Sequence, residues 1–160
     1  MRKTKPLVVN IVHRFNTGGL ENGVVNLVNN MSTYQHMVVS LTEVTGFRHR
    51  LHDPAVECVA LQKGPGRGFN IYPRLWRLLR NARPTIVHTR NLAALEMQPA
   101  AWAAGVPLRL HGEHGRDTDD PDGKSRRHQV ARRLYERFHP VLSASPVRIK
   151  GCPFDPRSTG

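Results

Sequence analysis

Short apolar runs alternate with amphipathic segments along most of the chain, and this alternation limits the folds open to it. Six apolar runs, several rich in β-branched residues, have the length of buried strands and cover residues 7–12, 37–41, 56–61, 85–88, 106–111 and 141–145. Apolar residues recur at helical spacing within segments 20–31, 71–82, 92–104 and 126–138. The alternation predicts a Rossmann-like α/β fold with a doubly wound parallel sheet.

A glycine pair joins the first strand to the first helix. Gly18 and Gly19 precede a helical stripe of apolar residues that runs from Leu20 to Met31. Glycines in this place make a tight turn, and they also let a ligand approach the backbone beside the positive end of a helix. The pair by itself does not decide between a turn and a ligand cradle.

Polar residues follow three of the predicted strands. His13 and Arg14 follow the first, segment 88–91 closes the fourth, and segment 111–115 closes the fifth. Ligands of doubly wound sheets bind outside the carboxyl ends of the strands. We therefore expect these three segments to meet at one rim, which favours the ligand cradle.

A second glycine-rich segment, 64–68, follows the third predicted strand and contains Arg67. It has the composition of a loop. We favour a solvated connector, with a mobile loop beside a substrate cleft as the alternative.

The chain is strongly basic, and the excess is uneven. Of the net charge of +12, residues 1–123 carry +5 and residues 124–160 carry +7. A basic surface is typical of proteins that bind nucleic acid, anionic membranes or phosphorylated substrates, and also of arginine-rich proteomes. Aromatic residues are sparse and are not interleaved with the basic ones, so nucleic acid is the least favoured partner.

Length and segment composition indicate one folded domain without a membrane span. The 160 residues suffice for a substantial core, and no apolar stretch approaches the roughly 20 residues that cross a bilayer. The apolar run after the basic start is shorter than a signal-peptide core, so we expect a cytoplasmic protein. Cys58 and Cys152 are isolated, which indicates reduced thiols.

Three familiar site patterns are missing from the sequence. The first turn lacks G-x-G-x-x-G and the second strand ends without an acidic residue, which argues against a dinucleotide cofactor. His111, Glu113 and His114 lie in a glycine-flanked segment without an H-E-x-x-H pattern, so we expect no metal. No G-x-S-x-G elbow is present. A histidine at a strand end can orient or deprotonate a hydroxyl, a role open to His111.

Three sequence blocks carry a family resemblance. They are GGLENGVVNLVNNM, KGPGRGFNIYPRLWRLLRNARPTIVHTRNLAALE and AGVPLRLHGEHGRDTDDPDG, in this order along the chain. From Val8 to about Phe138 the sequence resembles the amino-terminal domain of a retaining GT-B glycosyltransferase of the GT4 type. It is most similar to sugar transferases of bacterial exopolysaccharide clusters, the PEP-CTERM-linked group.

The resemblance implies a site and a reaction. An amino-terminal domain of this kind binds the acceptor, with Gly18 and Gly19 close to the donor diphosphate. His111 corresponds to a catalytic or sugar-orienting position, and Asn91 borders the same cleft. The strand-end rule adds Arg14, Arg90, Glu113 and His114 as substrate-binding residues. The implied partners are a nucleotide-diphosphate sugar and a glycan or lipid-linked acceptor, with no cofactor and no metal.

The carboxyl-terminal end departs from the family pattern. Enzymes of this type carry a second Rossmann-like domain, which binds the nucleotide sugar. Here the pattern decays after Phe138, as in a truncated or frame-shifted product. We expect residues 1–140 to form the acceptor-side domain and residues 141–160 a divergent, poorly ordered tail. Such a chain would bind donor weakly.

Two other functions remain open. One is a non-catalytic basic module for anionic membrane or nucleic acid, whose binding would fall steeply with salt. A peripheral location at the inner face of the membrane is compatible with the glycosyltransferase as well. The other is a small nucleotide-binding reductase on a similar fold, which a cofactor absorbance spectrum would reveal.

Overall fold

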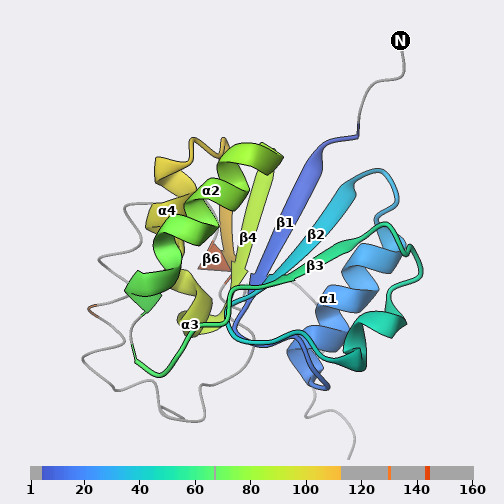
Figure 1. Ribbon diagram of the computed structural model, residues 1–160. Helices are drawn as coiled ribbons and strands as arrows, with labels where there is room; N and C mark the ends of the chain where they lie inside the picture. Colours follow the sequence, from blue (N-terminus) through green and yellow to red (C-terminus); the bar gives the residue numbers. More distant parts are fainter. Residues whose placement is uncertain (1–4, 67, 113–129, 131–142, 145–160) are drawn as a thin grey trace, which may run out of the picture.

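The computed structural model describes residues 5–66, 68–112, 130 and 143–144, and within them it contains one parallel sheet with helices on both faces (Figure 1). All strand pairs of the sheet are parallel, in the order β3-β2-β1-β4-β5-β6. This is the order of a Rossmann fold, with the direction of winding reversing between β1 and β4. The strands are β1 Leu7–Val12, β2 Gln35–Ser40, β3 Glu57–Ala60, β4 Ile86–Arg90, β5 Leu108–Gly112 and β6 Ser143–Ala144.

The helices divide between the two faces of the sheet. The α-helices are α1 Gly19–Asn30, α2 Tyr72–Ala82, α3 Asn91–Leu95 and α4 Gln98–Ala103, and the 3-10 helices are η1 Gly46–Arg50 and η2 Gly68–Ile71. Figure 1 shows α1 on one side of the sheet and α2, α3 and α4 on the other. Because both faces are covered, the central strands are apolar on both sides rather than alternating.

Two hydrophobic cores fill the spaces between sheet and helices. On the α1 side, Val12 and Val38 of the sheet pack with Val24 and Val28 of α1. On the other side, Ile11 and Val39 belong to the same cluster as Leu75 and Leu79 of α2 and several residues of α3 and α4. Each fully buried aliphatic side chain contributes about 2 kcal/mol relative to an exposed one. The helical stripes predicted from the sequence are the surfaces that these cores bury.

The predicted helix 92–104 is two helices in the structure. α3 ends at Leu95 and α4 begins at Gln98, with Pro99 in the first turn of α4. Proline has no N–H to donate to the carbonyl four residues back, and its ring clashes with that carbonyl. Pro99 therefore prevents a continuous helix through Leu95, and the break puts Glu96 and Met97 between the two helices.

Strand β4 is longer than the sequence predicts. The prediction ends at residue 88, whereas the strand continues through Thr89 and Arg90, which pair with His111 and Gly112 of β5. An arginine at a strand end is expected to be exposed to solvent, but the ladder with β5 continues to Arg90, and the residue is only 4% exposed. The fifth strand likewise runs from 108 to 112 rather than from 106 to 111.

Other predicted elements are confirmed with small shifts or lie outside the described residues. The first three strands and the helices at 20–31 and 71–82 appear within two residues of their expected bounds, and the segment between β2 and β3 contains η1. Of the predicted helix 126–138 only Val130 is described, and it is helical. Of the predicted tail 141–160, only β6 is described, where a strand was expected. None of the described helices has the length and apolar composition that crossing a bilayer requires.

Candidate functional site

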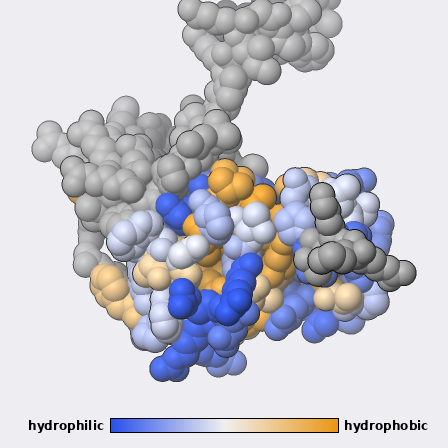
Figure 2. Space-filling view, turned by 90° about the horizontal axis from the view of Figure 1, so that it is seen from above, coloured by the Kyte–Doolittle hydropathy of each residue, from blue (hydrophilic) through white to orange (hydrophobic). Residues whose placement is uncertain are grey.

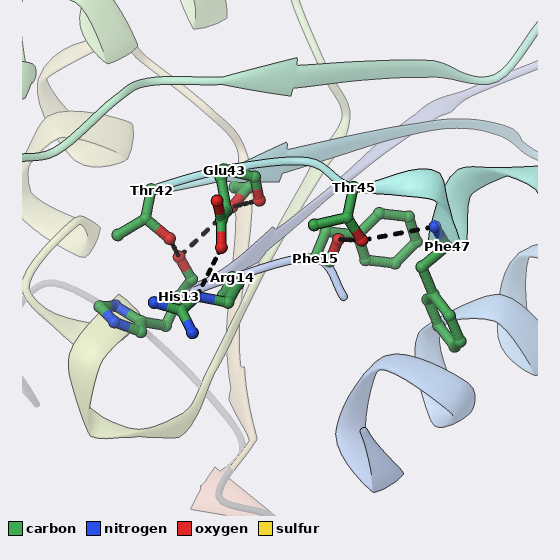
Figure 3. Close-up of polar contacts among 8 residues, drawn as sticks. His13, Arg14, Phe15, Thr42, Glu43, Thr45 and Phe47 are labelled. Atoms are coloured by element: carbon green, nitrogen blue, oxygen red, sulfur yellow. Dashed lines mark hydrogen bonds and ion pairs between the residues drawn. The ribbon is translucent and has the colours of Figure 1, made fainter. Parts of the chain in front are cut away.

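The segment after β1 is fixed against the segment after β2 by a set of hydrogen bonds (Figure 3). The carbonyl oxygen of His13 accepts hydrogen bonds from the Thr42 hydroxyl at 2.9 Å and the Thr42 amide at 3.0 Å. The Phe15 amide donates to the Glu43 carbonyl at 3.1 Å, and the buried Phe15 ring packs edge-on against Phe47. These bonds hold the backbone of residues 13–15 at the carboxyl edge of the sheet, so that the His13 and Arg14 side chains are exposed there.

An open pocket of about 550 Å³ lies at this edge. It is lined by residues that follow three neighbouring strands, namely 13–14 after β1, 42–43 after β2 and 62–66 after β3. Arg14 Nε lies 3.2 Å from Glu43 Oε1 on its rim. We refer to this pocket as the rim cleft. Residues 64–66 of the glycine-rich segment form part of its wall. These described residues therefore lie beside a cleft, as the alternative to a solvated connector requires.

A lysine–glutamate pair supports the rim cleft from the α2 side. Lys63 Nζ lies 2.8 Å from Glu96 Oε1, and both side chains are largely buried. The Tyr72 hydroxyl donates to the Glu96 carbonyl, and a Cβ added at Gly68 would come within 3.1 Å of Glu96 Oε1 and 2.9 Å of the Met97 methyl. Gly68 therefore lets η2 pack against the pair, and a larger residue there would displace it.

The charges around His13 favour its neutral form. Partial burial lowers the pKa of the His13 imidazole below its ordinary value of 6.5, and the Lys63 and Arg14 cations lower it further, while Glu96 raises it in part. At neutral pH the ring is therefore uncharged. An uncharged imidazole offers one ring nitrogen as a hydrogen-bond acceptor, and it can bind a hydroxyl group or take its proton.

The amino end of α1 already holds an anionic side chain. Gly18 is the N-cap, and Glu21 lies in the first turn, with its Oε2 at 2.2 Å from the place where a Cβ of residue 18 would stand. A carboxylate there satisfies the positive end of the helix, as a bound anion would. A Cβ at Gly19 would meet no atom within 4 Å. The open approach to the backbone is thus at Gly19, whereas Gly18 is covered by Glu21.

The end of β4 adds one buried and one half-buried polar residue. Arg90 is only 4% exposed, and its Nη2 lies 3.4 Å from His88 Nδ1. Burial lowers the pKa of the Arg90 guanidinium, which nonetheless remains charged at neutral pH. Asn91 begins α3 with a φ of +60°, a left-handed conformation that asparagine tolerates better than most residues. The last residue pair between β1 and β4 is Ile11 with Thr89, so Arg90 and Asn91 follow directly after it at the carboxyl end of β4.

His111 lies in a buried hydrogen-bond network on the α4 side of the sheet. Its ring is 5% exposed, and its Nδ1 lies 2.9 Å from the Thr89 hydroxyl on the neighbouring strand. Gln98 of α4 donates through Nε2 to that hydroxyl at 2.7 Å and to the Leu110 carbonyl at 2.9 Å. The network joins β4, β5 and α4. The described contacts of His111 therefore give it a role in the packing of the sheet.

The predicted site residues fall into three groups. Arg14, Gly18 and Gly19 lie together on the β1–α1 connection, with Arg90 and Asn91 at the end of the adjacent strand. His111 is two strands away from β1 and does not line the rim cleft. Glu113 and His114 lie outside the described residues. Within the described ranges no group of three or more His, Cys, Asp or Glu side chains is placed to hold a metal ion.

Several residues of the rim cleft were not predicted. Thr42, Glu43 and Lys63 follow β2 and β3, whose carboxyl ends meet the same edge as β1. The strand-end rule could have found them had it been applied to all strands. The one sequence signal for Glu96 is Pro99, three residues further along the chain. Pro99 breaks the helix and so places Glu96 between α3 and α4.

The sequence matches a family model over most of its length. Residues 17–146 match the model described as Glycosyltransferase Family 4. The chain belongs to this family. The match begins just before the glycine pair and includes strands β2 to β6. Of the residues that line the rim cleft, 42–43 and 62–66 lie within the matched region, whereas His13 and Arg14 precede it.

Other comparisons add little to the family 4 assignment. No curated protein matches the chain. Two structures of short-chain dehydrogenases/reductases from Veillonella parvula, one in complex with NADP and one ethylated, are 8% and 9% identical, with TM-scores of 0.48 and 0.49. Each alignment covers 83% of this chain and 63% of the other. A biotin carboxylase domain of a single-chain bacterial carboxylase is 23% identical, with a TM-score of 0.41, and the coverage is 82% and 29%.

Proposed function

We propose that this family 4 chain supplies the acceptor side of a glycosyl-transfer site. The observation that carries the proposal is the match to the family over residues 17–146, together with the rim cleft at the carboxyl edge of its sheet. The donor would be a nucleotide-diphosphate sugar and the acceptor a glycan or lipid-linked glycan. A role in exopolysaccharide synthesis and transfer with retention of configuration belong to the proposal through the sequence resemblance. A cytoplasmic location is part of the same proposal.

The rim cleft has the chemistry that sugar recognition needs. The Arg14–Glu43 ion pair and the Lys63 cation line the cleft and supply charged donors and acceptors suited to hydroxyl groups, and Glu96 holds Lys63 in place. Neutral His13 can accept a hydrogen bond from an acceptor hydroxyl, and Arg14 and Lys63 offset negative charge that develops on oxygen during transfer. The accessible backbone at Gly19 leaves room for the donor diphosphate beside α1.

His111 enters this proposal in a supporting role. The sequence resemblance makes it a catalytic or sugar-orienting residue, and this stays a prediction. His111 contacts Thr89, and Gln98 donates hydrogen bonds to Thr89 and to the Leu110 carbonyl. These contacts favour a role in which His111 stabilises the end of β5. We propose His13 as the histidine that meets the acceptor.

The binding site is tested by nuclear magnetic resonance titration of the isotopically labelled 160-residue chain. UDP- and GDP-sugars and a panel of oligosaccharides are added separately. We expect shifts of the backbone amides at 13–19, 42–43 and 62–66, and a weak donor Kd, on the order of 1 mM. Arg14→Ala should reduce the shifts, whereas Arg48→Ala, at an exposed arginine of η1 outside the rim cleft, should not.

Two results would overturn the proposal. One is a set of shifts remote from the rim cleft for every sugar and donor tested. The other is sub-micromolar binding of a nucleotide sugar to this chain alone, which would place the main donor site here. Transfer itself is followed by product mass with lipid-linked acceptors, and the anomeric coupling constant of the product reports retention or inversion.

A further inference from the structure

Another pocket lies between α1 and η1, on the face of the sheet opposite α2. Its volume is about 330 Å³, which is within the range of small-ligand pockets. One wall is the carboxyl-terminal half of α1, and the other is the end of η1 with the residues that follow it. We refer to it as the α1–η1 pocket. The polar residues that line it are Asn26, Asn29, Asn30, His49, Arg50 and His52.

Asparagines recur along one side of α1. Asn22, Asn26, Asn29 and Asn30 are spaced at i, i+4, i+7 and i+8, so they share the side of the helix that turns away from its buried valines. Asparagine is one of the weaker helix formers, so helix propensity does not account for four of them in one helix. Figure 2, seen from above Figure 1, shows mainly hydrophilic residues on the right, the side on which α1 lies in Figure 1.

Hydrogen bonds fix the η1 wall against α1. The Asn29 amide nitrogen donates to the Arg50 carbonyl at 3.0 Å, and the Asn29 amide oxygen accepts from the His52 amide at 2.9 Å. Arg50 Nη1 donates to the Asn22 amide oxygen at 2.6 Å, and the Arg50 guanidinium lies 5.4 Å from the Phe47 ring centroid. The guanidinium is therefore held at the pocket wall by two contacts, which reduces the entropy cost of binding a ligand.

Side chains of the pocket keep hydrogen-bonding capacity for a ligand. In the part of the chain that the structure describes, the Asn26 amide and the imidazoles of His49 and His52 have no hydrogen-bond partner. The Arg50 guanidinium donates there only through Nη1, so its Nε and Nη2 groups stay available. Amides and neutral imidazoles both donate and accept, whereas a guanidinium only donates.

The pocket is cationic. None of the described residues that line it is an aspartate or a glutamate. Glu21, the one acidic residue in the sequence of α1, lies in the first turn of the helix beside Gly18. Asp53 lies outside the lining, and its Oδ1 accepts a hydrogen bond from the Ala55 amide at 2.9 Å. A bound anion would therefore meet Arg50 without a carboxylate of the pocket wall competing for it.

We propose that the α1–η1 pocket binds an acidic saccharide, a sugar that carries a carboxylate or a phosphate group. A guanidinium binds either oxyanion through paired charge-assisted hydrogen bonds, which is the part that Arg50 plays. Sugar hydroxyls both donate and accept, as do the Asn26 amide and the imidazoles of His49 and His52. The binding does not depend on the reaction proposed for the rim cleft.

Other classes of ligand match the pocket less well. A nucleotide base needs an aromatic or apolar surface, and Val25 is the one apolar residue among the described residues of the lining. A metal ion needs more than the two imidazoles, and the described ranges hold no group of three or more His, Cys, Asp or Glu side chains placed for one. A neutral sugar would leave Arg50 without an anion.

The proposal is tested by resonance titration of the isotopically labelled 160-residue chain. Glucuronate, glucose 6-phosphate, glucose and inorganic phosphate are added separately. We expect at least one acidic sugar to shift the backbone amides at 25–30 and 48–52, with a Kd on the order of 1–10 mM. Glucose and inorganic phosphate should each bind about tenfold more weakly than that sugar. Comparison of the two acidic sugars identifies the oxyanion, and binding should weaken as salt rises.

Variants of the two walls give the contributions of single groups. Arg50→Ala should weaken binding of the acidic sugar about tenfold, and Arg50→Lys, which keeps the charge without the paired hydrogen bonds, about threefold. Asn26→Ala, at an exposed residue, should weaken it about threefold. Arg48→Ala removes an exposed arginine of the same 3-10 helix outside the lining, and as the matched control it should change binding less than about twofold. Circular dichroism verifies that each variant folds.

Four results would each contradict the proposal. They are equal affinities for glucose and the acidic sugars, equal affinities for inorganic phosphate and the acidic sugars, a loss in Arg48→Ala as large as that in Arg50→Ala, and acidic-sugar shifts confined to the rim cleft. The last result leaves the rim-cleft function standing. Shifts at 25–30 and 48–52 without any at the rim cleft would instead support the α1–η1 pocket alone, so the two proposals fail separately.

Discussion

His13 and His111 look alike in the sequence, because each closes an apolar strand and precedes a polar segment. In the fold they have opposite surroundings. His13 is exposed at the rim cleft, among the charges of Arg14, Lys63 and Glu96. His111 is buried on the α4 side of the sheet and contacts the hydroxyl of Thr89. The difference shows that a histidine at a strand end becomes a candidate for substrate contact only where no helix or neighbouring strand covers it.

The sharpest test of this contrast replaces each histidine by alanine. His111→Ala removes a buried ring and leaves the Thr89 hydroxyl without that contact, so we expect the free energy of unfolding to fall by about 2–4 kcal/mol. His13→Ala, at the surface, should change it by less than about 0.5 kcal/mol. Urea denaturation with unchanged m-values measures both. Equal losses for the two variants would contradict the contrast.

A second test compares buried polar groups with and without partners. Gln98 donates two hydrogen bonds, whereas both amide atoms of Asn10, in the centre of β1, have no hydrogen-bond partner among the described residues. Gln98→Leu should destabilise the protein by about 1–3 kcal/mol. Asn10→Leu should stabilise it by about 1–2 kcal/mol, because it removes an unpaired polar group. A loss of stability in Asn10→Leu would show that the amide is satisfied in solution.

The third test concerns the charges at the rim cleft. Lys63→Met removes a cation that lowers the His13 pKa and leaves Glu96 unopposed, so the pKa should rise; Glu96→Gln should lower it. Resonance titration of the His13 ring measures both shifts, with Arg48→Ala as the control. The unfolded chain binds a proton near pH 6.5 and the folded chain only at lower pH. Stability should therefore fall as the pH drops below 6.5, and His13→Ala should remove that part of the slope.

The smallest expected effect on stability is at the glycine pair. Gly19→Ala meets no atom within 4 Å and places a better helix former at the start of α1, so stability should rise by about 0.5 kcal/mol. Gly18→Ala requires only that the Glu21 carboxylate moves, with little change in stability. If Gly19→Ala weakens donor binding while Gly18→Ala does not, the open backbone at Gly19 is the point of approach. Equal binding by both variants would identify the pair as a turn alone.

Periodicity predicted the fold better than it predicted the site. The apolar runs and helical stripes located β1, β2, β3, α1 and α2, since burial of those residues stabilises the elements directly. The site depended on contacts remote in sequence. Lys63 meets Glu96 only because Pro99 breaks the helix and Gly68 permits close packing of η2. Arg90 pairs with β5 and is buried, and no local sequence pattern predicts this.

The sequence by itself determined the parallel doubly wound sheet, the glycine turn before α1 and the family, because strand length, helical spacing and motif order are properties of neighbouring residues. Only the tertiary structure decided which polar residues share a surface. It placed His13 with Lys63 and Glu96, assigned His111 to a buried network, and brought asparagines of α1 and Arg50 of η1 to one pocket. The physical reason is that exposure and charge at a residue depend on the elements packed around it, which lie far away along the chain.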